Sequence, residues 1–442
     1  MFNKEELIEI TGAKVLKDNG LDSDFTISTD TRTISEKDIY LPLKGETFDG
    51  EAFIDKAVEN GAKAYFTSQS CINDKADLVL NVKDTKEAYL KLAQYYRKKI
   101  DPTVVGITGS AGKTTTKEMV YSVLSAKYKT HKTFSNHNNE IGFCQTVLSM
   151  PEDTQMLIVE IGMRGLGEIE LITKYLNPDY AIVTNCGSAH VGRLGSLDNI
   201  AIAKCEIAKG LNQDGTFISL NQDIIKKHLQ FTGEKIFYAI NEVEVIEQKP
   251  SYSKFVYKNN IYELNVEGEY NIENSLSAIN VGLKTGMSEK EISKGLLNYH
   301  PIEKRWEVEE IKGLKFINDS YNANPESMKA SVKAFTQLYQ NPVVILGDMA
   351  ELGDNEVKYH REVGEFLAKL NKNVKYIFIG KLAHEIGKPL EAAGIDTKYF
   401  DNNKQASVYI VENLHKSNTI FLKASRAMKF EEILDYIKMR DR

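Results

Sequence analysis

The chain has 442 residues, more than one hydrophobic core usually serves, so we expect about two to four domains. Hydrophobic residues make up 42% and charged residues 27% of it, a composition that excludes a largely disordered chain. The net charge of −6 and the lack of a long basic run exclude nucleic-acid binding as the main function.

Cysteine spacing and the N-terminal segment bear on the compartment. Cys71, Cys144, Cys186 and Cys205 have neither CxxC spacing nor the pattern of a disulfide ladder, which favours a reducing compartment and a packing role. Residues 1–15 lack the apolar region of a signal peptide, and no apolar run approaches the ~20 residues needed to cross a bilayer. We therefore expect a cytoplasmic protein without membrane insertion.

Residues 1–100 mix short strand-like and helical segments and form the first predicted domain. Strands are expected at 24–28, 38–43, 63–67 and 77–82, and helices at 50–61 and 85–99. Pro102 and the β-branched run after it indicate that a second domain begins near Asp101.

From Asp101 onward strands alternate with helices, as in a mostly parallel sheet covered by helices on both faces. Strands are expected at 103–109, 156–162, 180–186 and 216–221, helices at 113–128, 199–211 and 271–286, and a β-hairpin turning on Asn259-Asn260. Pro301 and a charge cluster suggest a hinge, so we assign 101–304 to the second domain. A third α/β unit, 305–442, has strands expected at 315–320, 342–348, 374–380 and 418–425.

The segment 106–120, GITGSAGKTTTKEMV, places a glycine bracket between a strand and a helix. A standard phosphate loop has glycine, four residues, then Gly-Lys-Ser/Thr, but Ile107 stands where its first glycine belongs. The shorter bracket from Gly109 can still bind phosphate. Its N–H groups turn inward, the start of the helix has a positive potential, and Lys113 can reach the terminal phosphates. Thr114 supplies a hydroxyl for magnesium. The alternative is a glycine turn with an exposed lysine.

Two more polar residues follow predicted strands. Glu160 ends an apolar strand, where a carboxylate needs a partner such as the metal of a bound nucleotide. His190 follows the next strand in a Gly/Ser-rich loop, and alone it would be an ordinary loop residue. Because parallel strands end at the same edge of a sheet, we expect Glu160, His190 and Lys113 to lie together.

Five features together resemble the ATP-dependent Mur ligases of peptidoglycan synthesis. They are the short bracket, NHNNEIG at 136–142, the strand-end Glu160, NCGSAH at 185–190 and YNANPESM at 321–328. The resemblance extends over essentially the whole chain. It implies a three-domain α/β fold, with a central P-loop-type ATPase domain and a C-terminal Rossmann-like domain.

The resemblance also implies an activity. Such ligases use ATP to convert a carboxylate into an acyl phosphate, which an amine then attacks. Residues 318–331 are similar to the branch that adds D-alanyl-D-alanine to UDP-N-acetylmuramoyl-tripeptide, and the Asp-Asn-Pro-Arg segment of diaminopimelate-adding enzymes does not occur. Whether the third peptide residue is diaminopimelate or lysine stays open. Residues 1–100 would hold the UDP-linked substrate and 305–442 the dipeptide, closing on ATP, in a protein that we expect to be a monomer.

Site residues follow from the same resemblance. The implied ATP contacts are Thr108, Gly109, Ser110, Ala111, Gly112, Lys113, Thr114, Thr115, Asn274, Arg305 and Asp319. The implied Mg²⁺ ligands are Thr114 and Glu160 for one ion, and His190 and a carbamylated Lys204 for a second, with Lys113 completing the catalytic set. The implied substrate contacts are Ser28, Asp30, Arg32, Lys44, Asn136, Asn138, Asn139, Tyr321, Asn322, Asn324, Lys423 and Arg426.

Four positions depart from the family pattern: Glu51 and Tyr270 each replace a histidine, Ala424 replaces a glycine, and Cys205 differs from the small residue usual there. Taken singly, Lys204 could be a solvated helix lysine and Asp319 a helix cap. For the whole chain, the alternatives are a ligase similar to folylpolyglutamate synthetase and a non-catalytic nucleotide-binding regulator with a decayed ligase fold.

Overall fold

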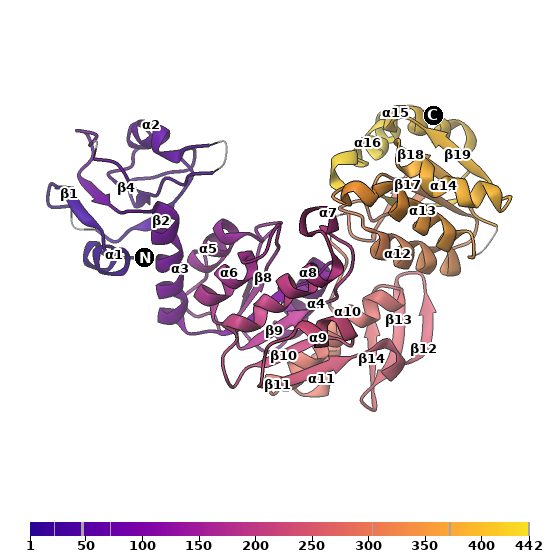
Figure 1. The fold of residues 1–442 in the computed structure, drawn as a ribbon, viewed down its shortest axis with the longest axis horizontal. Coiled ribbons are helices and arrows are strands. Elements are labelled where there is room, and N and C mark those ends of the chain that lie inside the picture. Colours follow the sequence, from indigo (N-terminus) through magenta and orange to yellow (C-terminus); the bar gives the residue numbers. More distant parts are fainter. Residues whose placement is uncertain (22, 46–47, 71, 303, 371–372, 441–442) are drawn as a thin grey trace.

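The computed structural model describes residues 1–21, 23–45, 48–70, 72–302, 304–370 and 373–440, so Cys71 lies outside the described residues. Three sheet-containing regions follow one another along the chain in a crescent (Figure 1). Each of their sheets lies within one of the expected domains. The mixed α/β architecture with mostly parallel sheets confirms the predicted fold class.

The N-terminal region is a five-stranded sheet in the order β1-β5-β4-β3-β2, parallel except for β1. Its elements are α1 (Lys4–Thr11), β1 (Lys14–Asp18), β2 (Thr26–Ser28), β3 (Asp38–Tyr40), η1 (Gly50–Phe53), α2 (Ile54–Glu59), β4 (Ala64–Thr67), β5 (Leu78–Asn81) and α3 (Thr85–Ile100). Helix α3 begins where the Asp84 side chain accepts the N–H groups of Lys86 and Glu87. The sequence pattern did not predict α1 or β1.

The central region is a six-stranded, wholly parallel sheet in the order β11-β10-β9-β6-β8-β7. Its strands are β6 (Thr103–Thr108), β7 (Thr130–Lys132), β8 (Met156–Glu160), β9 (Tyr180–Val183), β10 (Thr216–Leu220) and β11 (Glu234–Tyr238). Its helices are α4 (Lys113–Leu124), α5 (Glu140–Leu148), α6 (Glu168–Leu176), α7 (Val191–Leu194), α8 (Leu197–Cys205), η2 (Glu206–Gly210), α9 (Asp223–His228), η3 (Ile240–Glu242), α10 (Glu269–Lys284) and α11 (Glu289–Leu297). Because β8, β6 and β9 are neighbours, the segments that follow them meet at one edge.

The expected hairpin is the second half of a three-stranded antiparallel sheet. Its strands are β12 (Glu244–Lys249), β13 (Tyr252–Tyr257) and β14 (Asn260–Leu264). The predicted turn at Asn259-Asn260 is wrong by one residue, because Tyr257 pairs with Asn260 and the turn consists of Lys258 and Asn259. Both turn residues have positive φ, +50° and +64°, as a two-residue hairpin turn of this type requires.

The C-terminal region is a six-stranded sheet in the order β15-β16-β20-β17-β18-β19, parallel except for β15. Its elements are β15 (Glu307–Ile311), β16 (Leu314–Asn318), α12 (Pro325–Leu338), β17 (Pro342–Gly347), η4 (Gly353–Asn355), α13 (Glu356–Leu367), β18 (Lys375–Ile379), α14 (Ala383–Ala392), β19 (Thr397–Phe400), α15 (Asn403–Asn413), β20 (Thr419–Lys423), η5 (Arg426–Met428) and α16 (Glu431–Met439). Within the described ranges, no helix combines the length and apolar character needed to cross a membrane.

Candidate active site

A cavity of about 1490 Å³ opens where the central strands end. Its walls come from all three regions of the crescent, with Lys44 and Lys86 from the first and Lys423 from the third. The predicted site residues that line it are Lys44, Ser110, Ala111, Gly112, Lys113, Thr114, Thr115, Asn136, Asn138, Asn139, Glu160, His190, Asn274, Arg305, Asp319, Tyr321, Asn322, Asn324 and Lys423. The fold therefore gathers most of the expected residues around one space.

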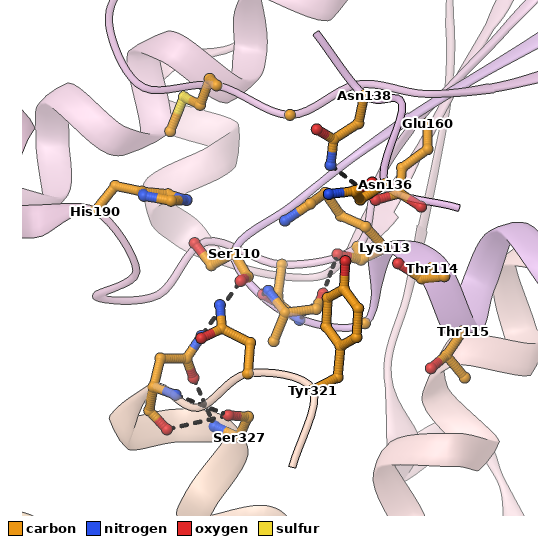
Figure 2. Close-up of a pocket in the computed structure, with 18 of the residues that line it drawn as sticks. Ser110, Lys113, Thr114, Thr115, Asn136, Asn138, Glu160, His190, Tyr321 and Ser327 are labelled. Atoms are coloured by element: carbon orange, nitrogen blue, oxygen red, sulfur yellow. Dashed lines mark hydrogen bonds between the residues drawn. The ribbon is translucent and has the colours of Figure 1, made fainter. Parts of the chain in front are cut away.

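The glycine bracket forms a tight loop between β6 and α4. Gly112 is the N-cap of α4 with φ +77°, and a Cβ atom on it would lie 2.5 Å from Asn274 Oδ1, so only glycine fits. The Lys113 ammonium donates to the Gly109 carbonyl at 2.8 Å (Figure 2). Burial lowers the pKa of Lys113, and the charge of Glu160 partly opposes that shift. The first N–H groups of α4 have no acceptor within the helix, which makes this loop suited to an anion.

Glu160 lies in the wall of the same cavity with only 3% of its surface exposed. Asn138 Nδ2 donates to its Oε1 at 3.2 Å, whereas its buried Oε2 accepts no hydrogen bond. The buried Lys117 ammonium lies 3.7 Å from Oε2 and donates to the Thr133 carbonyl at 2.9 Å. A buried carboxylate oxygen without a hydrogen bond is suited to a cation.

His190 lines the cavity from the loop after β9, and Figure 2 shows it on the other side of the phosphate loop from Glu160. Its Nδ1 lies 2.5 Å from Glu351 Oε2 of the C-terminal region, and this contact lowers the pKa of Glu351. Among the described residues, no group of three or more His, Cys, Asp and Glu side chains could hold a metal. The expected metal sites therefore depend on Thr114 and Lys204 as well.

Lys204 lies in α8, 1% exposed, and does not itself line the cavity. Burial lowers its pKa well below the usual value, and the charge of Lys113 adds to this effect. Cys186, which interacts electrostatically with Lys204, does line the cavity. Lys204 is thus not a solvated helix lysine, and its surroundings favour the neutral amine.

The far end of the cavity joins α10 to the C-terminal region. Thr116 Oγ1 donates to Asn274 Oδ1 at 3.3 Å, and the Arg305 guanidinium lies 4.0 Å from the centre of the Tyr321 ring. Asp319 is not a helix cap, since α12 is capped by Asn324, and it instead accepts from Lys423 Nζ at 2.5 Å. This ion pair, between the buried Lys423 and the partly buried Asp319, holds Lys423 within the wall of the cavity.

Tyr270 and the buried Trp306 meet at the same junction, with ring centres 5.8 Å apart. Tyr270 stands where the family pattern has histidine, and its hydroxyl is buried. Trp306 also packs on Phe421 of β20, at 5.4 Å between ring centres. An aromatic cluster therefore connects the central and C-terminal regions beside the cavity.

Seven expected residues do not line the large cavity. Thr108, Gly109 and Lys204 lie behind its wall. Ser28 and Asp30 line a separate cavity of about 270 Å³, which shares Gln145 with the large one. Arg32 is exposed and pairs with Asp30 at 2.6 Å, and its hydrogen bond lowers the pKa of Asp30 to about 2. Arg426 pairs with Glu431 at 2.5 Å.

Glu51 and Ala424, two further departures from the family pattern, have local partners. The Glu51 carboxylate accepts hydrogen bonds from Thr67 Oγ1 at 2.7 Å and from the Ser68 N–H at 2.6 Å, which ties η1 to the end of β4. Ala424 is fully buried and packs closely against Gly347. Glu51 is therefore held by hydrogen bonds and Ala424 by close packing within the region where each lies.

The sequence analysis missed Lys117, Trp306, Glu326 and Glu351 as residues of the site. Lys117 and Glu326 lie inside motifs that were singled out, but nothing in a single sequence distinguishes them from surface charges. A lysine one helical turn after Lys113 is the one available signal, because residues four apart share a helix face. Glu351 lies in the segment 346–353, LGDMAELG, which also resembles the family, but its contact with His190 joins residues that are far apart in the sequence.

Comparison with known proteins follows the same division of the chain. Residues 26–97 match the Mur ligase family catalytic domain, 107–282 the Mur ligase middle domain, and 304–426 the Mur ligase glutamate ligase domain. The UDP-N-acetylmuramoyl-tripeptide--D-alanyl-D-alanine ligase of Bacillus subtilis is 36% identical over 421 residues, 92% of each chain.

Solved structures agree with this. A crystal structure of MurF from Acinetobacter baumannii has a TM-score of 0.90 at 27% identity and covers 99% of both chains. MurF ligase from Thermotoga maritima in complex with ADP has a TM-score of 0.83 at 25% identity, covering 94% of this chain and 97% of that one. The resemblance read from the motifs is therefore confirmed, and the chain belongs to the Mur ligase family.

Proposed function

We propose that the protein is an ATP-dependent amide ligase that joins D-alanyl-D-alanine to UDP-N-acetylmuramoyl-tripeptide and releases ADP and phosphate. The observation that carries the proposal is one cavity in which the phosphate loop faces Tyr321, Asn322 and Asn324 of the C-terminal region. The likeness over 92% of the chain to the Bacillus subtilis ligase supports the choice of substrates.

The proposed division of labour follows the three regions. Residues 1–100 would hold the UDP-linked substrate, 101–304 ATP, and 305–442 the dipeptide. Lys44 at the large cavity, and Ser28 and Asp30 at the small one, support the first assignment. Because Gln145 lines both cavities, a long substrate could extend from one to the other.

Joining a carboxylate to an amine in water is unfavourable, so the acid must first be activated. The peptide carboxylate and the γ-phosphate of ATP are both anions, and their approach requires neutralisation and in-line positioning. Lys113 and the N–H groups at the start of α4 supply positive charge at the phosphates. The acyl phosphate that results would hydrolyse in water, which gives a reason for three regions to enclose one cavity.

Two metal sites belong to the proposal. Mg²⁺ bound at Thr114 and Glu160 would neutralise the phosphates, and the buried Glu160 Oε2 without a hydrogen bond fits such an ion. His190 and a carbamylated Lys204 would hold a second ion. Carbon dioxide reacts with neutral amines, and burial favours that form of Lys204 by lowering its pKa. A carbamate would also place a negative charge beside the metal, where an ammonium would place a positive one.

Two other functions are less well supported. A ligase similar to folylpolyglutamate synthetase would have no use for a UDP-binding region, whereas residues 26–97 match the Mur ligase catalytic domain. A non-catalytic regulator would have no reason to keep Lys113 and the buried Glu160 in the wall of one cavity, with the buried Lys204 near Lys113. We further propose that the protein acts in the cytoplasm as a monomer, in keeping with its free thiols at Cys144, Cys186 and Cys205.

The deciding experiment measures orthophosphate release from ATP with UDP-N-acetylmuramoyl-tripeptide, with D-alanyl-D-alanine present or omitted. Mass spectrometry should show a UDP-linked pentapeptide only in the complete mixture. Separate tripeptides ending in diaminopimelate and in lysine would establish the preference at the third residue. No lengthened product from either tripeptide, with Mg²⁺ and all reactants present, would refute the proposal.

A further inference from the structure

The loop between β9 and α7 is bound on both sides. Toward the phosphate loop, the Gly187 N–H donates to Ser110 Oγ at 2.9 Å, and Ser110 Oγ donates back to the Gly187 carbonyl at 3.0 Å. Toward the C-terminal region, the Ser188 N–H and Oγ both donate to the carboxylate of Glu326, at 3.0 and 2.9 Å. His190 follows two residues later. One short loop therefore connects the phosphate loop to α12.

The carboxylate of Glu326 comes close to the backbone at Gly187. A Cβ atom on Gly187 would lie 2.9 Å from Cδ of Glu326, so glycine at this position makes room for the carboxylate. Asn324, the N-cap of the same helix, also donates from Nδ2 to the Ser110 carbonyl at 3.2 Å. Two residues at the start of α12 thus contact the phosphate loop, one directly and one through Ser188.

We propose that Glu326 is a positioning residue, which holds the Gly187–Ser188 segment so that docking of the C-terminal region orders the phosphate loop for ATP. The proposal rests on the proposed function only in taking ATP as the ligand of that loop. Both carboxylate oxygens of Glu326 accept hydrogen bonds from Ser188, so the role proposed for Glu326 is to hold this segment and not to contact the reacting atoms. Ser188 is 2% exposed, so the donors of both hydrogen bonds are shielded from water, whereas Glu326 itself is exposed.

The hydrogen bonds between Glu326 and Ser188 can be separated experimentally from a simple charge contact between the same two regions. An ion pair, Lys333 with Glu269 at 3.0 Å, also joins α12 to the central region, but both of its side chains are exposed. Exposed pairs of this kind contribute little. Lys333→Ala is therefore a matched control, which removes a charge contact between the same two regions without touching Ser188.

The test measures ATP affinity by calorimetry, which does not depend on turnover. Glu326→Ala should weaken ATP binding about tenfold, the effect of ~1.4 kcal/mol, while Lys333→Ala stays within about twofold of the parent. Glu326→Gln should retain most of the affinity, because its amide oxygen can accept from the Ser188 N–H and its NH₂ can donate to Ser188 Oγ. Affinity for the UDP-tripeptide without ATP should not change in any variant.

A double-mutant cycle separates positioning from general destabilisation. Ser188→Ala should weaken ATP binding, and Glu326→Ala combined with Ser188→Ala should be no worse than Glu326→Ala alone, because both changes remove one contact. Parent-like ATP affinity in Glu326→Ala, additive losses, or an equal loss in Lys333→Ala would overturn the proposal. If Glu326→Ala does not fold, Glu326→Gln and Ser188→Ala decide the matter by the same measurement. Absence of ligation by the parent would refute the proposed function alone.

Discussion

Replacing Gly112 by alanine tests whether the short glycine bracket is the ATP site. Gly112 has φ +77°, and the left-handed conformation costs a residue with a Cβ atom about 1–2 kcal/mol. The new Cβ would also lie 2.5 Å from Asn274 Oδ1, which must move and give up its hydrogen bond with Thr116, worth about 1 kcal/mol. If this whole cost of about 2–3 kcal/mol appears in the ATP-bound form of the loop, ATP binding becomes about 30- to 150-fold weaker.

The assay is calorimetric titration with ATP, together with a thermal melt. Gly286→Ala is the matched control, because Gly286 has φ +73° but no atom within 4 Å of an added Cβ. That variant should lose about 1 kcal/mol of stability from backbone strain and keep its ATP affinity. Unchanged ATP affinity in Gly112→Ala would refute the reasoning, and an equal loss in Gly286→Ala would show that backbone strain acts through the whole fold.

Three further predictions concern buried lysines. Lys113→Ala should abolish orthophosphate release and leave affinity for the UDP-substrate within about twofold, since that substrate relies mainly on another region; normal turnover would contradict the phosphate assignment. Burial lowers the pKa of Lys204 in the folded protein, so the unfolded chain binds more protons at this residue than the folded protein does. The destabilising effect of Lys204 therefore shrinks as the pH rises toward about 10.4, the pKa of a lysine in the unfolded chain. Lys204→Met should therefore lack ligase activity. In buffer free of carbon dioxide, where the parent keeps the amine, it should melt above the parent at neutral pH by a margin that narrows on going to pH 9, and a constant margin would exclude the lowered pKa. Lys423→Met leaves the partly buried Asp319 with Ser331 as its donor and should cost about 2 kcal/mol of unfolding free energy, partly recovered by adding Asp319→Asn; a melt like that of the parent would contradict the contribution of this ion pair.

The buried strands were predictable because they are short apolar runs of β-branched residues between helices. Val104, Val105 and Ile107 in β6 are fully buried, as such a run indicates. The hairpin was located, but its turn was placed one residue late, since Asn259 and Asn260 have the same preference for turns and only the pairing of Tyr257 with Asn260 decides. Helix α1 and strand β1 were missed because their periodicity is short and mixed with charges.

The phosphate loop was predictable for a different reason, namely that its glycines, lysine and threonine are local in sequence. Contacts between segments that are far apart in the sequence were not predictable. The Glu51 carboxylate replaces an expected histidine and binds Thr67 and Ser68, a pairing that no local pattern contains. Arg426 stays a predicted substrate contact, and its ion pair with Glu431, five residues on at the start of α16, is one that the sequence analysis did not predict.

Trp306 is the single tryptophan of the chain, and it lies where α10 and β20 come together. If the C-terminal region closes on ATP as we propose, this buried indole acts as an internal optical probe, because separating it from Tyr270 would admit water and shift its emission to longer wavelength. No dye or engineered label is needed. Stopped-flow mixing with each reactant in turn would thus give the order and the rates of the rigid-body movements during a turnover.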